Sequence, residues 1–209
     1  MIGLAIHTSS PELGLACRDL AQGTQRSQVW PLGRDLTAYL HECLIEFLSP
    51  YAWSEVAYIA VAKGPGGFTG TRIGVVVART LAQQLQIPLF GVSSLAAIAQ
   101  YHQLTATLAP EQLDPIAVSL RAQRGEIFGA IYQAQPPVVA PELPEALYSE
   151  ADWEAKLNHW PTPYQLIAAE GGLAPTVEGV LSLAQHQWHM GDRPDWSSVL
   201  PFYGQHPVR

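Results

Sequence analysis

The chain has 209 residues, 48% of them hydrophobic, so it can bury one large core or the cores of two smaller lobes. Its formal net charge of −7 disfavours tight binding of nucleic acid by this chain alone, because such binding depends largely on neutralising phosphates. No basic-then-apolar leader opens the sequence and no apolar run approaches the roughly 18 residues of a membrane span, so we expect a cytoplasmic protein without membrane contact.

The first fifty residues predict three strands followed by a helix. Short β-favouring runs indicate strands over 2–6 and 13–17 and a third near 25–30. A helix over about 35–49 would carry one apolar face, extended around the cylinder by two further leucines. The residues of that face are Leu36, Tyr39 or Leu40, Cys43 and Phe47. The two cysteines, Cys17 and Cys43, lie in apolar stretches without metal-ligand spacing, which predicts reduced core thiols.

Residues 56–95 are predicted to form a strand, a glycine-rich turn, a long helix and a second strand. The run 56–62 is continuously apolar, as a strand covered on both faces requires. Glycine and proline at 64–67 interrupt regular structure. Thr69 or Thr71 is the predicted cap of a helix to about residue 86, which ends before Pro88.

The glycine-rich turn raises the question of a phosphate site, because a helix N-terminus after such a turn attracts anions. The Walker motif requires a lysine after its last glycine, and none follows Gly70. The dinucleotide motif requires a glycine at its sixth position, and counting from Gly64 that position is Thr69. The spacing therefore favours a rigid turn that packs strand against helix over an anion site.

The helix after this turn is apolar on more than one side. Ile73, Val77, Leu81 and Leu85 form one row, and the small residues Gly74, Ala78 and Ala82 form a second row beside it. A helix of this kind must be covered on several sides. Two interpretations remain open: a central helix of a large core, or a helix with one side docked on another subunit.

The second half predicts a smaller lobe. Ser93 or Ser94 would cap a helix to about 103, and a polar stretch then separates a first lobe, residues 1–106, from a second, residues 107–209. Strands over 115–120 and 126–133 would form a hairpin, and the proline-rich segment 135–144 would be a linker or an irregular edge segment. The remaining elements would be a helix capped by Ser149, a strand over 164–169, a helix over 176–189, and a tail from 191 wrapping back over the body.

Few side chains suggest chemistry. His7 at a strand end, and the pair His186 and His189, are more often ordinary polar residues than metal ligands, and no third ligand lies near the pair in sequence. Arg121 and Arg124 near the hairpin turn could face a cleft or simply be solvated. The sequence predicts no catalytic, cofactor-binding or metal-binding residue.

The stretch GPGGFTGTRIGVVVARTLAQQLQIPLFGVSSL resembles the signature of the TsaB (YeaZ) family, which serves the synthesis of threonylcarbamoyladenosine in tRNA. MIGLAIHTSS resembles that family's opening strand, and LRAQRGEIFGAIY resembles its second-lobe strand pair. The family's Asp-Thr-Ser is His7-Thr8-Ser9 here, and its Asp-Ala-Arg is Arg121-Ala122-Gln123. The signature loop comprises Gly64, Pro65, Gly67, Phe68, Thr69, Gly70 and Arg72.

The resemblance implies an α/β fold with two ribonuclease-H-like lobes of the actin, Hsp70 and sugar-kinase (ASKHA) type, the second lobe reduced. It also implies a non-catalytic scaffold that binds and activates a TsaD-type transferase subunit and recruits a TsaE-type ATPase, with tRNA reached only through the complex and a homodimer possible. The alternative function is an ASKHA-type phosphotransferase or ATP hydrolase using the inter-lobe cleft. The expected partner interface is Leu36, Tyr39, Leu40, Cys43, Phe47, Ile73, Gly74, Val77, Ala78, Leu81 and Ala82.

Overall fold

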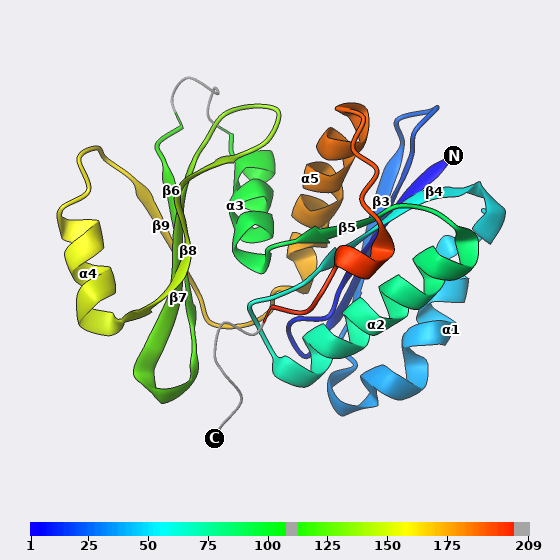
Figure 1. Ribbon diagram of the computed structural model, residues 1–209, viewed down its shortest axis with the longest axis horizontal. Helices are drawn as coiled ribbons and strands as arrows, with labels where there is room; N and C mark the ends of the chain where they lie inside the picture. The colour runs from blue at the N-terminus through cyan, green and yellow to red at the C-terminus, as the bar shows by residue number, and fades with distance from the viewer. Residues whose placement is uncertain (108–112, 203–209) are drawn as a thin grey trace.

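The computed structural model describes residues 1–107 and 113–202 and contains two β-sheets with helices packed against each (Figure 1). The strands are β1 (Ile2–His7), β2 (Leu13–Asp19), β3 (Gln25–Trp30), β4 (Val56–Ala62), β5 (Leu89–Val92), β6 (Ile116–Arg121), β7 (Glu126–Gln133), β8 (Ala140–Ser149) and β9 (Gln165–Ala169). The α-helices are α1 (Leu36–Leu48), α2 (Phe68–Leu85), α3 (Ser94–Thr105), α4 (Glu150–Asn158) and α5 (Val177–His189).

The first sheet has the order β3-β2-β1-β4-β5. The β1–β2 and β2–β3 pairs are antiparallel, and the β1–β4 and β4–β5 pairs are parallel, so the sheet is mixed. Alternation along each strand gives the sheet two unlike faces. Large aliphatic residues lie on the face that packs against α1 and α2, whereas mainly alanines of β1, β2 and β4 lie on the face that packs against α5.

The second sheet has the order β8-β7-β6-β9 and is covered on both faces. Leu95 and Ile98 of α3 pack against one face, and Trp153 and Leu157 of α4 pack against the other. Helix α5 follows this sheet in sequence but packs on β1, β2 and β4 of the first sheet. The division of the chain at residues 106 and 107 stays a prediction.

Most predicted elements are confirmed, and of the two interpretations of 135–144 the irregular edge segment matches from Ala140 onward. Strand β8 begins at Ala140 and pairs antiparallel with β7 through a register irregularity. Pro141 and Pro144 fit this strand because β8 lies at the edge of its sheet and pairs with β7 alone. Across residues 1–107 and 113–202, no helix is both long and apolar enough to cross a bilayer.

The predicted caps and cysteines have mixed outcomes. The Ser93 side chain accepts from the N–H groups of Leu95 and Ala96, and Ser149 accepts from Asp152 N–H, so both caps are confirmed. The predicted threonine cap of α2 is wrong, because Gly67 occupies the N-cap position and no side chain caps the helix. Cys17 and Cys43 are free thiols and both are buried, as predicted.

Candidate functional site: the signature loop and the cleft

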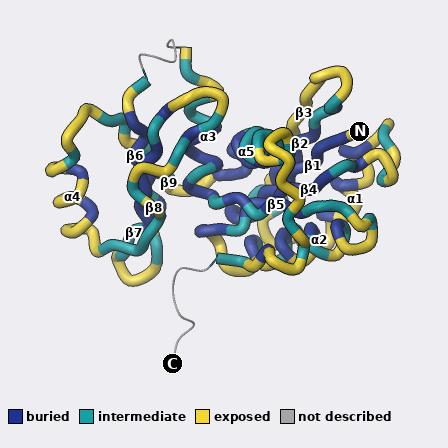
Figure 2. The backbone as a smooth tube through the Cα atoms, turned by 45° about the horizontal axis from the view of Figure 1, so that its top comes forward, coloured by how far each residue is buried: buried dark blue, intermediate teal, exposed yellow. Residues whose placement is uncertain are grey.

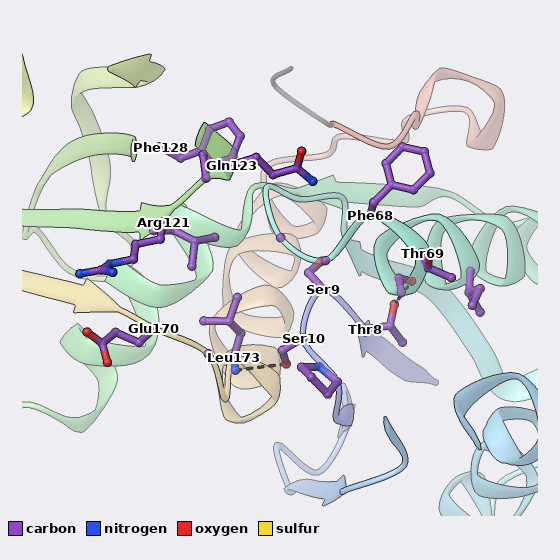
Figure 3. A pocket seen from close by; sticks show the side chains of 18 of the residues that line it. Thr8, Ser9, Ser10, Phe68, Thr69, Arg121, Gln123, Phe128, Glu170 and Leu173 are labelled. Atoms are coloured by element: carbon purple, nitrogen blue, oxygen red, sulfur yellow. Dashed lines mark hydrogen bonds between the residues drawn. The ribbon is translucent and has the colours of Figure 1, made fainter. Parts of the chain in front are cut away.

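A cleft of about 1350 Å³ lies where the two sheets face one another (Figure 3). Its first-lobe wall is formed by the β1–β2 turn, the signature loop and the start of α1. Its second-lobe wall is formed by the β6–β7 turn and residues 170–173. The two walls meet where Leu173 N–H donates to Ser10 Oγ at 3.2 Å.

The signature loop packs directly on the β1–β2 turn. Gly67 N–H donates to the Ser9 carbonyl oxygen at 2.7 Å. A Cβ atom on Gly66 would lie 2.4 Å from that same oxygen, and one on Gly70 would lie 2.2 Å from the Thr8 carbonyl oxygen. Any side chain at either position would force backbone apart, so these glycines are required by contact within the chain. The interpretation as a tight packing turn is supported without invoking an anion.

The small-residue row of α2 continues the same contact. Thr8 Oγ1 donates to the Gly70 carbonyl oxygen at 2.8 Å, and a Cβ on Gly74 would lie 2.1 Å from Thr8 Oγ1. Ala78 and Ala82 follow in the row and are fully buried in the core of the first lobe. Of the two open interpretations, the small-residue row therefore matches a core helix, because the row faces the chain's own sheet.

The residues of the expected partner interface occupy three different environments (Figure 2). Those buried in the chain's own core are Leu36, Leu40, Cys43, Phe47, Gly74, Ala78 and Ala82. Those half-buried against it are Ile73, Val77 and Leu81, whereas Tyr39 is 49% exposed. Two apolar residues outside the expected set, Ile45 and Val76, are 63% and 53% exposed on these helices. Neither appeared in the predicted stripes, because a helix that is apolar all round does not reveal which side faces out. The interface itself stays a prediction.

The signature-loop residues differ in exposure. Gly64 and Pro65 are buried, whereas Gly67, Thr69 and Arg72 are exposed. Phe68, the first residue of α2, is 52% exposed and lines the cleft. In Figure 3, the Gln123 amide extends toward the side of the cleft on which Phe68 lies.

The arginines of the β6–β7 turn lie on the second-lobe wall. Arg121 ends β6 and Arg124 occupies the turn with a left-handed φ of 59°, and both line the cleft. The Arg121 guanidinium points away from Ser9, on the side where Glu170 lies (Figure 3). Among the described residues, no group of three or more His, Cys, Asp or Glu side chains could hold a metal ion, and this holds for the pair His186 and His189.

His7 ends β1 beneath the cleft and is fully buried. Ser9 N–H faces its Nδ1 at 3.4 Å, and within the described chain Nε2 has no hydrogen-bond partner. Burial without a counter-charge lowers the pKa of the imidazole from 6.5 to about 3. The ring is therefore neutral at physiological pH and cannot replace a carboxylate as an oxygen ligand for magnesium.

Acidification is expected to destabilise the fold through His7. The His7 imidazole binds a proton near pH 6.5 in the unfolded chain but only near pH 3 in the folded chain. The free energy of unfolding therefore has its full value above pH 6.5 and decreases as the pH falls toward 3. The slope would approach about 1.4 kcal/mol per pH unit between these limits. Urea unfolding at several pH values should show this slope in the wild type and a shallower one in His7→Gln. Equal slopes in both proteins would contradict the assignment.

The sequence of this chain is similar to those of known proteins. A family model described as "TsaD: tRNA N6-adenosine threonylcarbamoyltransferase" matches residues 36–181. The "tRNA threonylcarbamoyladenosine biosynthesis protein TsaB" of Bacillus subtilis (strain 168) is 33% identical over 128 residues, which are 61% of this chain and 53% of that protein. The chain thus spans about half the length of this curated relative.

Two solved structures from Pseudomonas aeruginosa superimpose over almost the whole chain. The structure named "YeaZ from Pseudomonas aeruginosa" has a TM-score of 0.78 at 26% identity and covers 97% of this chain and 99% of that one. A second, of an uncharacterized protein with similarity to peptidase YeaZ, has the same TM-score of 0.78 and identity of 26%, with coverages of 98% and 99%.

The two mixed sheets, their covering helices and the cleft between them define an α/β protein with the fold of the two Pseudomonas aeruginosa structures. Its signature loop opens the longest helix of the described chain, on the first-lobe wall. The chain belongs to the family of the matching model, and within it to the TsaB (YeaZ) proteins.

Proposed function

We propose that this chain is a non-catalytic subunit in the synthesis of threonylcarbamoyladenosine in tRNA. It would bind and activate a TsaD-type transferase subunit in the cytoplasm, and a TsaE-type ATPase would join the complex. The names of its relatives and the match to the TsaD family model support this role. The net charge of −7 supports contact with tRNA only through the complex.

The chemistry of the cleft supports the absence of catalysis by this chain. Magnesium-nucleotide chemistry requires carboxylate oxygens at the strand ends that face the cleft. The end of β1 carries the neutral His7, and the end of β6 carries Arg121, followed by Ala122 and Gln123. Neither strand end supplies a carboxylate, and the signature loop is held on Thr8 and Ser9 by its own close contacts.

The observation that carries the proposal is the apolar surface left on the outer sides of α1 and α2. Tyr39 and Ile45 on α1, and Val76 on α2, are each about half exposed or more. Exposed apolar residues on neighbouring elements are typical of a protein–protein contact. The TsaD-type subunit is the occupant that the family match favours, and a second copy of this chain would compete for the same surface.

Calorimetric titration with Mg-ATP separates this function from the alternative, a phosphotransferase or ATP hydrolase. We expect no saturable heat from the isolated chain, because the ends of β1 and β6 supply no carboxylate to hold the metal. A TsaD-type subunit titrated in the same buffer is the positive control. Stoichiometric binding that requires magnesium would contradict the proposed function and favour the alternative.

A further inference from the structure

The last described segment of the chain, residues 194–202, crosses from the first lobe to the space between the lobes (Figure 1). We call it the C-terminal strap. Leu89 N–H donates to the Pro194 carbonyl oxygen at 3.3 Å, so the strap begins on β5, the edge strand of the first sheet. Phe202 N–H donates to the Lys63 carbonyl oxygen at 2.6 Å, so it ends beside the signature loop.

The middle of the strap is anchored on the first lobe. Val199 is 6% exposed and belongs to the first-lobe core, and a Cβ on Gly91 of β5 would lie 2.8 Å from its Cγ1. Trp196 packs against the same core, and the Arg79 guanidinium of α2 lies 5.7 Å from its ring centroid. An apolar anchor and a cation–π contact thus attach the strap to β5 and α2.

The end of the strap contacts the second lobe. The Phe202 ring lies 6.3 Å from the Phe128 ring, at an interplanar angle of 61°, which is a favourable edge-to-face arrangement. Phe128 belongs to the core of the second sheet and also lines the cleft. Phe202 therefore joins the loop after β4 to the core of the other lobe.

Gly64 of the signature loop allows the backbone of the strap to approach closely at Phe202. Its φ is +103°, a conformation that favours glycine, and a Cβ there would lie 2.4 Å from the Phe202 carbonyl oxygen. Its own carbonyl oxygen accepts from Ser94 N–H at 2.8 Å, at the start of α3. The first glycine of the signature is thus explained by the strap, whereas Gly66 and Gly70 are explained by the β1–β2 turn.

We propose that the C-terminal strap is a clamp that sets the opening of the cleft. Phe202 holds the second lobe through Phe128, while Val199 and Trp196 hold the first lobe and α2. Widening the cleft requires the Phe202–Phe128 contact to separate, because Val199 fixes the strap in the first-lobe core. The clamp also links the second lobe to α2, the helix whose outer side carries Val76.

Spin labels on the two lobes test the clamp in the full chain. Gln83→Cys on α2 and Glu154→Cys on α4 are exposed sites, and the native Cys17 and Cys43 are buried. In this background, Phe202→Ala is expected to make the inter-label distance distribution about twice as wide and to shift it to longer distances, because the lobes then sample more open states. Leu200→Ala is the matched control, since Leu200 lies in the same strap but is 60% exposed.

A conservative variant separates clamping from misfolding. Phe202→Leu keeps an apolar contact with Phe128, so its distribution should lie between those of the wild type and Phe202→Ala. Circular dichroism of each variant confirms that it is folded. An unchanged distribution in a folded Phe202→Ala or Phe202→Leu protein, or equal broadening in Leu200→Ala, would overturn the proposal.

Discussion

Adding a single methyl group at residue 70 is expected to lower the free energy of unfolding by about 2–3 kcal/mol, as overpacking of a rigid contact does. The Cβ of Gly70→Ala would lie 2.2 Å from the Thr8 carbonyl oxygen, which is backbone and cannot rotate away. The start of α2 or the β1–β2 turn would have to move, and both belong to the first-lobe wall of the cleft. Urea unfolding of the two proteins measures the difference.

Gly67→Ala is the control for this prediction in the same loop. Gly67 has a φ of −58°, which any residue adopts, and a Cβ there would lie 3.5 Å from the Ser9 carbonyl oxygen, an ordinary contact. Its unfolding free energy should fall by about 1 kcal/mol at most, because alanine is only a poorer N-cap than glycine. Similar losses of unfolding free energy in Gly67→Ala and Gly70→Ala would contradict the prediction. They would show that the contact with the Thr8 carbonyl oxygen is not what excludes a side chain at residue 70.

The second large effect is expected on partner binding. Val76→Glu should weaken binding to a TsaD-type subunit about a hundredfold or more, as truncating or charging a central interface residue does. Val76 is 53% exposed on α2, so the folded chain should tolerate the charge with little change in Tm. Titration of the labelled partner with each purified variant gives the two dissociation constants.

Two further variants make this result specific. Leu104→Glu charges a residue of similar exposure, 48%, on α3, and should bind the partner as the wild type does. Ala78→Glu is expected to unfold or strongly destabilise the chain, because Ala78 is fully buried against the sheet. Unimpaired binding by a folded Val76→Glu protein would exclude the outer side of α2 as the contact.

The parts of the fold that sequence reasoning predicts well are those that local periodicity specifies. Strand β4, bounded by the glycine turn, has the predicted limits 56–62, and the serine caps of α3 and α4 occur where predicted. The extent of β8 to Ser149 is not predicted, because Pro141 and Pro144 usually exclude a regular strand and only its place at a sheet edge permits them.

The site was less predictable, because its contacts join residues distant in sequence. The row of Gly74, Ala78 and Ala82 shows that α2 approaches a neighbour closely, but part of that neighbour is Thr8, more than sixty residues earlier in the chain. The sequence around α2 does not show whether this close neighbour belongs to the same chain or to a partner subunit. The C-terminal strap has no periodic pattern, so its contact with Phe128 became visible only in the fold.

The central claim is that this chain supports a transferase through its surface and catalyses nothing itself. The direct measurement is formation of threonylcarbamoyladenosine on tRNA by reconstituted TsaD-type and TsaE-type subunits, with the wild-type chain, with Val76→Glu, or without either. We predict that product accumulates with the wild type and falls to the level without the chain when Val76→Glu replaces it. Product formed by this chain alone, or an undiminished rate in its absence, would contradict the account.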